Sequence, residues 1–265
     1  MKYSNLERWD FNAPLMSAIQ QKLGIILVSE GVKPACDIQI NSTYPSKGVS
    51  QQELDAARKS LGLGPYPGVS SVPEIIRDEF LIAKRVQMGN LCGPLGEEPL
   101  ISGSEKENLE KILADLGLEY NAESNDYTPN AIARRDESGN LIKVPLAHIN
   151  FLIAKKRSDL NQLVAVAGDH DSDKKIDSQR IRGRLFGYPV SAVEAYINGS
   201  SLNRVSSIDL GDYELFKLFD FSRRDHPDEI ETVLGWGKII ERVSPTMFEK
   251  AKAAAEYLRN IRRSS

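Results

Sequence analysis

The sequence predicts an α+β protein, with an antiparallel sheet followed by a C-terminal group of helices that includes a helix-turn-helix-like corner. Two capping boxes precede segments whose apolar residues recur at helical spacing. Apolar segments between residues 118 and 154 follow one another with short connections, as antiparallel strands do. After residue 158 the helical spacing returns. Together these observations favour an α+β fold over a doubly wound parallel sheet.

The chain is predicted to have two parts, which form separate subdomains or one compact unit. Residues 1–95 should form an N-terminal α/β subdomain, and residues 96–265 the antiparallel sheet with the C-terminal helices. The boundary falls in residues 89–99, where glycine and proline are too frequent for regular structure. Glu97 and Glu98 stand where a phosphate-binding loop would need a basic or hydroxyl residue. This segment is therefore interpreted as a linker.

The N-terminal part should begin with a helix that is capped by Asn12, has Pro14 in its first turn and ends at Gly24. Residues 24–28 are then predicted to be a buried strand, because they form a short apolar run with β-branched residues. Residues 37–40 alternate like a second strand, after a turn.

Two helices should pack on these first strands. Ser50 and Glu53 form a capping box, so one helix is expected to begin at about Gln51. Pro73 should open a stronger helix with Ile76 on its apolar face.

A second capping box, Ser104 and Glu107, opens the clearest helix of the chain, which Gly117 should end. Four strands are expected after this helix, at residues 118–122, 131–135, 141–144 and 148–154. Residues 136–140 have the composition of a hairpin turn.

The C-terminal helices are predicted from their caps and apolar stripes. Ser158 precedes one helix, and Pro227 and Pro245 each open a longer one. Between them, residues 178–198 form two short amphipathic segments that meet at Gly187-Tyr188-Pro189. Glycine can leave a helix through positive φ, and proline suits the first turn of the next helix.

The composition is that of a globular protein and limits the expected partners. The formal net charge of −3 predicts no general attraction to nucleic acid or anionic lipid. No stretch approaches the ~20 apolar residues of a membrane helix, which predicts a soluble, cytoplasmic protein without a membrane partner. Cys36 and Cys92 lie far apart in the chain and are expected to be reduced thiols.

Two polar segments contain residues of the types that bind metals or catalyse reactions. Residues 169–177 place carboxylates at several ligand positions of a calcium loop. However, Lys174 and Arg180 stand where that loop needs a glycine and a bidentate carboxylate. His226 lies among carboxylates at a predicted helix start, where acidic residues complement the helix dipole. The sequence therefore predicts no metal site, no cofactor and no catalytic triad.

The corner resembles a helix-turn-helix of the repressor type. That motif has a small residue, an apolar residue, a turn glycine and two apolar contacts, and the matching positions are Gly183, Phe186, Gly187, Val193 and Tyr196. The resemblance implies DNA binding as an alternative function.

Six side chains would then contact DNA, three on the phosphate backbone and three near base edges: Arg180, Arg182 and Arg184, and Tyr188, Ser191 and Glu194. The arginines alternate in sequence and point in different directions around a helix, so at most two can meet one phosphate row. The second segment contains no lysine or arginine, and phosphates would repel Glu194, which disfavours nucleic acid as a partner.

The same stretch also resembles a segment of a poorly characterised prokaryotic protein family, Gly-Tyr-Pro-x-Cys-Cys-Val-x-x-Phe. Gly187-Tyr188-Pro189 and Val193 agree with this segment, and Tyr196 replaces its phenylalanine. The two cysteine positions hold Ser191 and Ala192 here, so no metal or redox role is implied. This resemblance supplies no activity.

The first functional hypothesis is a binding protein or an enzyme that takes up a small molecule between the two parts of the chain. The pocket is expected near residues 89–99, where the two parts meet. A metabolite bound there should protect this segment from limited proteolysis.

The DNA-binding hypothesis makes a prediction about salt. Substituting Arg180 and Arg184 should weaken duplex binding, and each lost phosphate contact should reduce the steepness of the fall of log affinity with log salt by roughly 0.9. Binding titrations over a range of salt concentrations measure this slope. An absence of duplex binding at low salt would leave the corner as a packing element.

Overall fold

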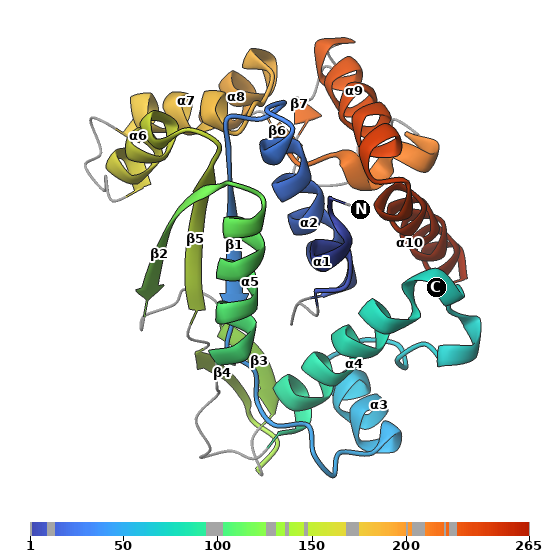
Figure 1. Ribbon diagram of the computed structural model, residues 1–265. Coiled ribbons are helices and arrows are strands. Elements are labelled where there is room, and N and C mark those ends of the chain that lie inside the picture. The colour runs from blue at the N-terminus through green and yellow to red at the C-terminus, as the bar shows by residue number, and fades with distance from the viewer. Residues whose placement is uncertain are drawn as a thin grey trace.

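The computed structural model has an α+β fold that is layered around a three-stranded antiparallel sheet (Figure 1). The structure describes residues 2–9, 14–93, 103–125, 131–135, 138–145, 148–167, 175–199, 201–202, 210–219, 221–222 and 227–264. The predicted fold class and the antiparallel sheet are confirmed. Asn12, residues 169–174 and His226 lie outside the described residues.

The central strand of this sheet is β5 (His148–Ala154). It pairs antiparallel with β1 (Ala35–Asn41) along one edge and with β2 (Glu119–Asn125) along the other. The strands expected at these places are therefore confirmed. Because β1 comes from the N-terminal part of the chain and β5 from the C-terminal part, the sheet joins the two parts. A division at residue 95 stays a prediction.

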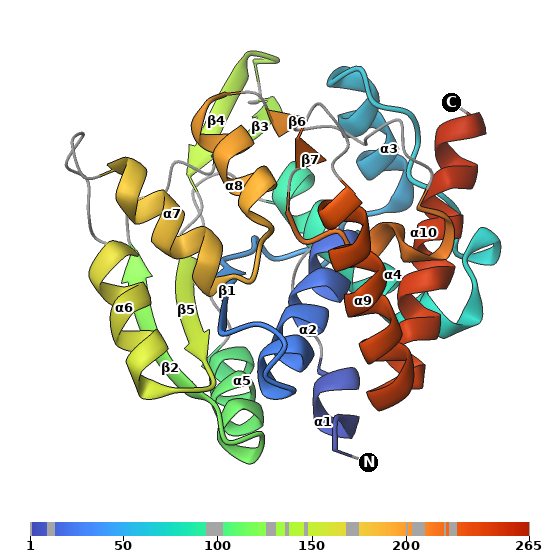
Figure 2. The ribbon, with the colours of Figure 1, turned by 90° about the horizontal axis from the view of Figure 1, so that it is seen from above.

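The two faces of the sheet pack on different helices, as Figure 2 shows. These are α2 (Leu15–Ser29) and α5 (Gly103–Asp115) on one face, and α6 (Arg157–Ala167) and α7 (Lys175–Leu185) on the other. Ile38 and Phe151 belong to the core on the α2 side, whereas Leu152 and Ala154 belong to the core on the α6 side. This is the period of two that a strand imposes on its side chains.

Beyond α2 lies a further layer, made by α9 (Pro227–Val243) and α10 (Pro245–Ser264) (Figures 1 and 2). The short helix η3 (Gly211–Phe216) packs on α2, α9 and α10. The remaining helices are α1 (Ser4–Glu7), α3 (Gln51–Ser60), η1 (Val69–Ser71), η2 (Glu74–Ile76), α4 (Arg77–Cys92) and α8 (Val190–Ile197). Helix α2 is thus enclosed between the sheet and the C-terminal helices.

The predicted hairpin is confirmed, but its strands do not extend the central sheet. β3 (Ala131–Arg135) and β4 (Leu141–Pro145) form a two-stranded sheet of their own. β6 (Ser201–Leu202) and β7 (Phe221–Ser222) form another.

The strand predicted for residues 24–28 is wrong, because these residues continue α2. Ile25, Ile26 and Leu27 are all fully buried. A helix that is enclosed on every side loses the 3.6-residue apolar period of a surface helix, so its sequence resembles a buried strand. Gly24 does not end this helix. It lets α2 approach β1, since a Cβ atom at Gly24 would lie 3.6 Å from Cβ of Cys36.

The irregular segment predicted from residue 89 begins later than expected, because α4 continues to Cys92. Gly89 serves close packing there: a Cβ atom at this position would lie only 1.9 Å from the carbonyl oxygen of Tyr44. Residues 94–99 lie outside the described part of the chain. The first capping box is confirmed, since the Ser50 hydroxyl accepts from the Glu53 N–H and the Glu53 carboxylate accepts from the Ser50 N–H.

A buried ion cluster ties α2 to α4 and α10. Lys22 is only 1% exposed, and its Nζ lies 3.6 Å from Oε1 of Glu79. Nζ of Lys250 lies 2.5 Å from the same oxygen. Lys22 also donates to the carbonyl oxygen of Glu7. Because an uncompensated buried charge costs several kcal/mol, these partners fix how the helices meet.

None of the helices in the described ranges has both the length and the apolar composition that crossing a bilayer requires.

The two helix glycines Gly89 and Gly235 give a matched test of this packing. We expect Gly89→Ala to destabilise the fold by roughly 1–3 kcal/mol, because the added methyl group meets backbone atoms of Tyr44. Gly235→Ala should stabilise it by about 0.5–1 kcal/mol, because open space surrounds Gly235 in α9 and alanine favours the helix. Urea denaturation of both variants measures these changes, and equal effects would contradict the packing at Gly89.

Candidate ligand-binding site

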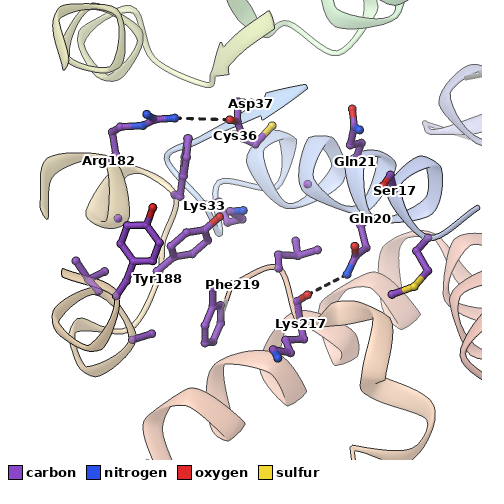
Figure 3. Close-up of a pocket in the computed structure, with 18 of the residues that line it drawn as sticks. Ser17, Gln20, Gln21, Lys33, Cys36, Asp37, Arg182, Tyr188, Lys217 and Phe219 are labelled. Atoms are coloured by element: carbon purple, nitrogen blue, oxygen red, sulfur yellow. Dashed lines mark hydrogen bonds and ion pairs between the residues drawn. The ribbon is translucent and has the colours of Figure 1, made fainter. Parts of the chain in front are cut away.

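A cavity of about 760 Å³ lies between α2, the start of β1, the corner of α7 and α8, and residues 210–219 (Figure 3). This volume is within the range of roughly 300–1,000 Å³ that is usual for small-molecule sites. Its walls come from both the N-terminal and the C-terminal parts of the chain. The cavity lies at the α7–α8 corner, whereas the sequence predicts a pocket near residues 89–99.

The α2 wall is mostly polar, whereas the rest of this helix is mostly apolar. The residues of α2 that are only partly buried are Met16, Ser17, Gln20 and Gln21, and all of them line the cavity. They are spaced so that they share one face of the helix. Nε2 of Gln20 donates to the carbonyl oxygen of Lys217 at 3.0 Å, which joins this face to the opposite wall (Figure 3).

The α7–α8 corner forms a second wall, and its two predicted helices and their glycine turn are confirmed. Gly187 has φ of +67°, and the N–H of Tyr188 donates to the carbonyl oxygen of Gly183 at 2.9 Å. The helices cross closely, because a Cβ atom at Gly183 would lie 2.4 Å from Cγ2 of Val193. The tight turn places Phe186 and Tyr188 on the cavity.

Lys33 reaches the cavity from the segment that connects α2 to β1. Gly31 ends this helix with φ of +73°, and the N–H groups of Val32 and Lys33 both donate to the carbonyl oxygen of Leu27. Pro34 then leads into β1, so the predicted turn is confirmed. These backbone contacts fix the position of Lys33 relative to α2.

The Lys33 side chain is enclosed by aromatic rings and is only 3% exposed. Its Nζ lies 5.1 Å from the ring centroid of Trp236, 5.3 Å from that of Tyr188 and 5.9 Å from that of Phe186. Phe219 packs between Tyr188 and Trp236, with ring centroids 5.5 and 5.6 Å away. In the part of the chain that the structure describes, no carboxylate forms an ion pair with Lys33.

Burial lowers the pKa of Lys33 below its usual 10.5, and the nearby Cys36 and Asp37 oppose this shift. The aromatic rings also favour the charged form, by about 2 kcal/mol or more for a desolvated cation. Removing an ammonium ion from water costs several kcal/mol, and burial is the largest cause of the lowered pKa. The neutral amine is therefore more populated at Lys33 than at an exposed lysine.

Cys36 and Asp37, at the start of β1, line the cavity near Lys33. Burial raises the pKa of Cys36 to about 12, so this thiol is protonated at neutral pH and is not a thiolate nucleophile. Oδ2 of Asp37 lies 3.8 Å from Nη2 of Arg182 (Figure 3). Both partners are partly exposed, so this ion pair adds little stability.

Four other residues proposed to contact DNA have protein partners, on the corner itself, on α6 and on α9. Arg180 donates to both carboxylate oxygens of Glu194, at 2.7 and 3.1 Å, and this contact lowers the pKa of Glu194. Arg184 donates to Oε1 of Gln162, and Ser191 donates to Oδ2 of Asp228. The three arginines thus point to three different groups. DNA binding by the corner stays a prediction.

His148 does not line the cavity. It is buried at the start of β5, its Nδ1 has no hydrogen-bond partner in the described residues, and burial lowers its pKa. Within the described ranges, no three His, Cys, Asp or Glu side chains gather in a way that could hold a metal ion.

Sequence reasoning missed Lys33, the most enclosed cation of the cavity. The available signal was a single lysine between two buried apolar segments, residues 24–28 and 35–40. That pattern is also typical of an exposed turn. The rings of Tyr188 and Trp236, which enclose Lys33, are distant in sequence.

Comparison with protein-family models, with curated proteins and with solved structures finds no match to this chain. The function is therefore inferred from the geometry of the site.

The lowered pKa of Lys33 predicts how stability varies with pH. Between that lowered pKa and 10.5, the unfolded chain holds a proton that the folded chain has released, so stability rises with pH. The free energy of unfolding of the wild type, relative to Lys33→Met, should therefore increase across this window by up to about 1.4 kcal/mol per pH unit. Denaturant titrations at several pH values measure the difference.

Lys238→Met is the control, because Lys238 is exposed on α9. This variant should follow the wild type at every pH. A pH-independent difference between wild type and Lys33→Met would show that Lys33 is charged throughout.

Proposed function

We propose that this protein binds a small organic molecule in the cavity between α2 and the α7–α8 corner. The observation that carries this proposal is the polar face of α2. The other residues of that helix are buried, whereas the face with Met16, Ser17, Gln20 and Gln21 is partly exposed and lines the cavity. A face of this kind inside a layered fold supplies the few polar groups that orient a ligand.

The walls favour a ligand that has both an apolar part and oxygen acceptors. Phe186 and Tyr188 offer ring faces against which planar or apolar groups can pack. Lys33, Arg182 and Lys217 offer nitrogen donors, which suit carbonyl or carboxylate oxygens. Because Arg182 is paired with Asp37 and Lys33 has no carboxylate partner in the described residues, Lys33 is the donor best placed to take a ligand oxygen.

A cavity-filling variant tests this proposal. Ser17→Trp places an indole in the cavity from a partly buried position, and Ser60→Trp places the same group on the exposed end of α3. In a thermal-shift screen of small carboxylates, oxo acids, aldehydes, sugars and nucleotides, a ligand at 100 times its Kd adds about 2.7 kcal/mol of stability. We expect such a ligand to stabilise the wild type and Ser60→Trp, and Ser17→Trp to lose at least tenfold in affinity.

Two outcomes would contradict the proposal. One is a hit that binds Ser17→Trp as tightly as it binds Ser60→Trp, which would place the ligand elsewhere. The other is the absence of any stabilising compound in the screen.

A further inference from the structure

We propose that Lys33 forms an imine with a carbonyl group of the molecule that occupies the cavity. This inference rests on the proposed ligand site and adds to it a reactive group and a substrate class, the aldehydes and ketones. It stands on three features of the geometry: the enclosure of Lys33 by aromatic rings, the lack of a carboxylate partner for its amine in the described residues, and its place in the lining of the cavity.

The enclosure of Lys33 makes its Nζ the candidate reactive atom of the cavity. The ring faces of Phe186, Tyr188 and Trp236 surround Nζ, and the side chain lines the cavity. Gly187 permits this packing, because a Cβ atom there would lie 3.3 Å from Cγ of Lys33. Lysines that are desolvated in apolar pockets are the ones that act as amine nucleophiles, since burial favours the neutral form.

A second buried lysine, Lys22, can be compared with Lys33. Lys22 is as deeply buried as Lys33, yet its ammonium group lies beside the Glu79 carboxylate and does not line the cavity. That arrangement is what a structural buried charge requires. In the described residues, Lys33 has no such carboxylate, and it faces the cavity. Its surroundings therefore suit an uncharged amine that meets a ligand.

The proposed reaction is a condensation without oxidation or reduction. The lone pair of Nζ attacks the carbonyl carbon and forms a C–N bond, while the π electrons of the C=O bond move to oxygen, which takes one hydrogen of the amine as a proton. The carbinolamine then loses its C–O bond, and the oxygen leaves as water with the second amine hydrogen. The product is a C=N bond between Lys33 and the ligand, and the site returns to the free amine by hydrolysis.

Reductive labelling of the native, full-length chain tests the inference. The probes are formaldehyde, which is small enough to enter a confined site, and pyruvate, a small ketone with a carboxylate. Sodium cyanoborohydride reduces any imine to a stable amine, and peptide mass spectrometry identifies the labelled lysine. We expect labelling at Lys33 at pH 7 to exceed that at Lys217 by about tenfold or more, because burial lowers the pKa of Lys33 and so increases the fraction of neutral amine.

Lys217 is the matched control, because it lines the same cavity but is only partly buried. Lys217→Met should leave labelling at Lys33 unchanged. Lys33→Met should abolish the rapid labelling that is expected at Lys33. Site mapping on the native chain decides the question even where a variant folds poorly. Slower labelling of Lys33 than of Lys217 by both probes would overturn the inference.

The two proposals fail in different ways. A compound that binds the wild type but not Ser17→Trp, and that leaves no reduced adduct on Lys33 although it carries a carbonyl group, supports the ligand site and overturns the imine. A labelled Lys33 whose reaction with pyruvate is blocked in Ser17→Trp and retained in Ser60→Trp supports both.

Discussion

The burial of α2 is the constraint on which the rest of this structure depends. A helix that is apolar on nearly every side has to be covered on every side, and here the sheet, α4, η3, α9 and α10 share that task. The same enclosure requires partners for Lys22, which α4 and α10 supply through Glu79 and Lys250. The layers seen in Figures 1 and 2 thus pack around one helix, α2. Beside it, the pairing of β1 with β5 joins the N-terminal and C-terminal parts of the chain.

At the candidate site, by contrast, α2 is only partly buried. Where α2 carries Ser17, Gln20 and Gln21, its side chains are only partly buried and line a cavity whose opposite wall includes the α7–α8 corner. Lys33 lies at the same site. Its N–H donates to the carbonyl oxygen of Leu27 at the end of α2, and the α7–α8 corner supplies rings around its amine. One helix therefore sets both the polar wall of the cavity and the position of its most enclosed cation.

The elements that the sequence predicts correctly are those whose conformation depends on residues nearby in the chain. The capping box at Ser50, the strand at β5 and the turn at Gly187 each depend on neighbours within a few residues, and each was found where it was expected. The errors share a different cause. Residues 24–28 and Gly89 owe their conformation to distant segments that cover them or approach them closely, and a short window of sequence does not contain those segments. Lys33 was missed for the same reason, since Trp236 lies far along the chain.

The α7–α8 corner is where the two functional hypotheses meet, and its two sides differ in chemistry. Its inner side holds Gly187 and Tyr188 against Lys33, where the missing Cβ and the ring face both have a packing role. On its outer side, Arg180 is held by two hydrogen bonds to Glu194, so a phosphate would have to displace a carboxylate that already matches the guanidinium fork. The inner side needs no such exchange, because Lys33 has no carboxylate partner in the described residues and already lines the cavity. The corner is therefore better suited to closing a ligand cavity than to presenting charge to DNA.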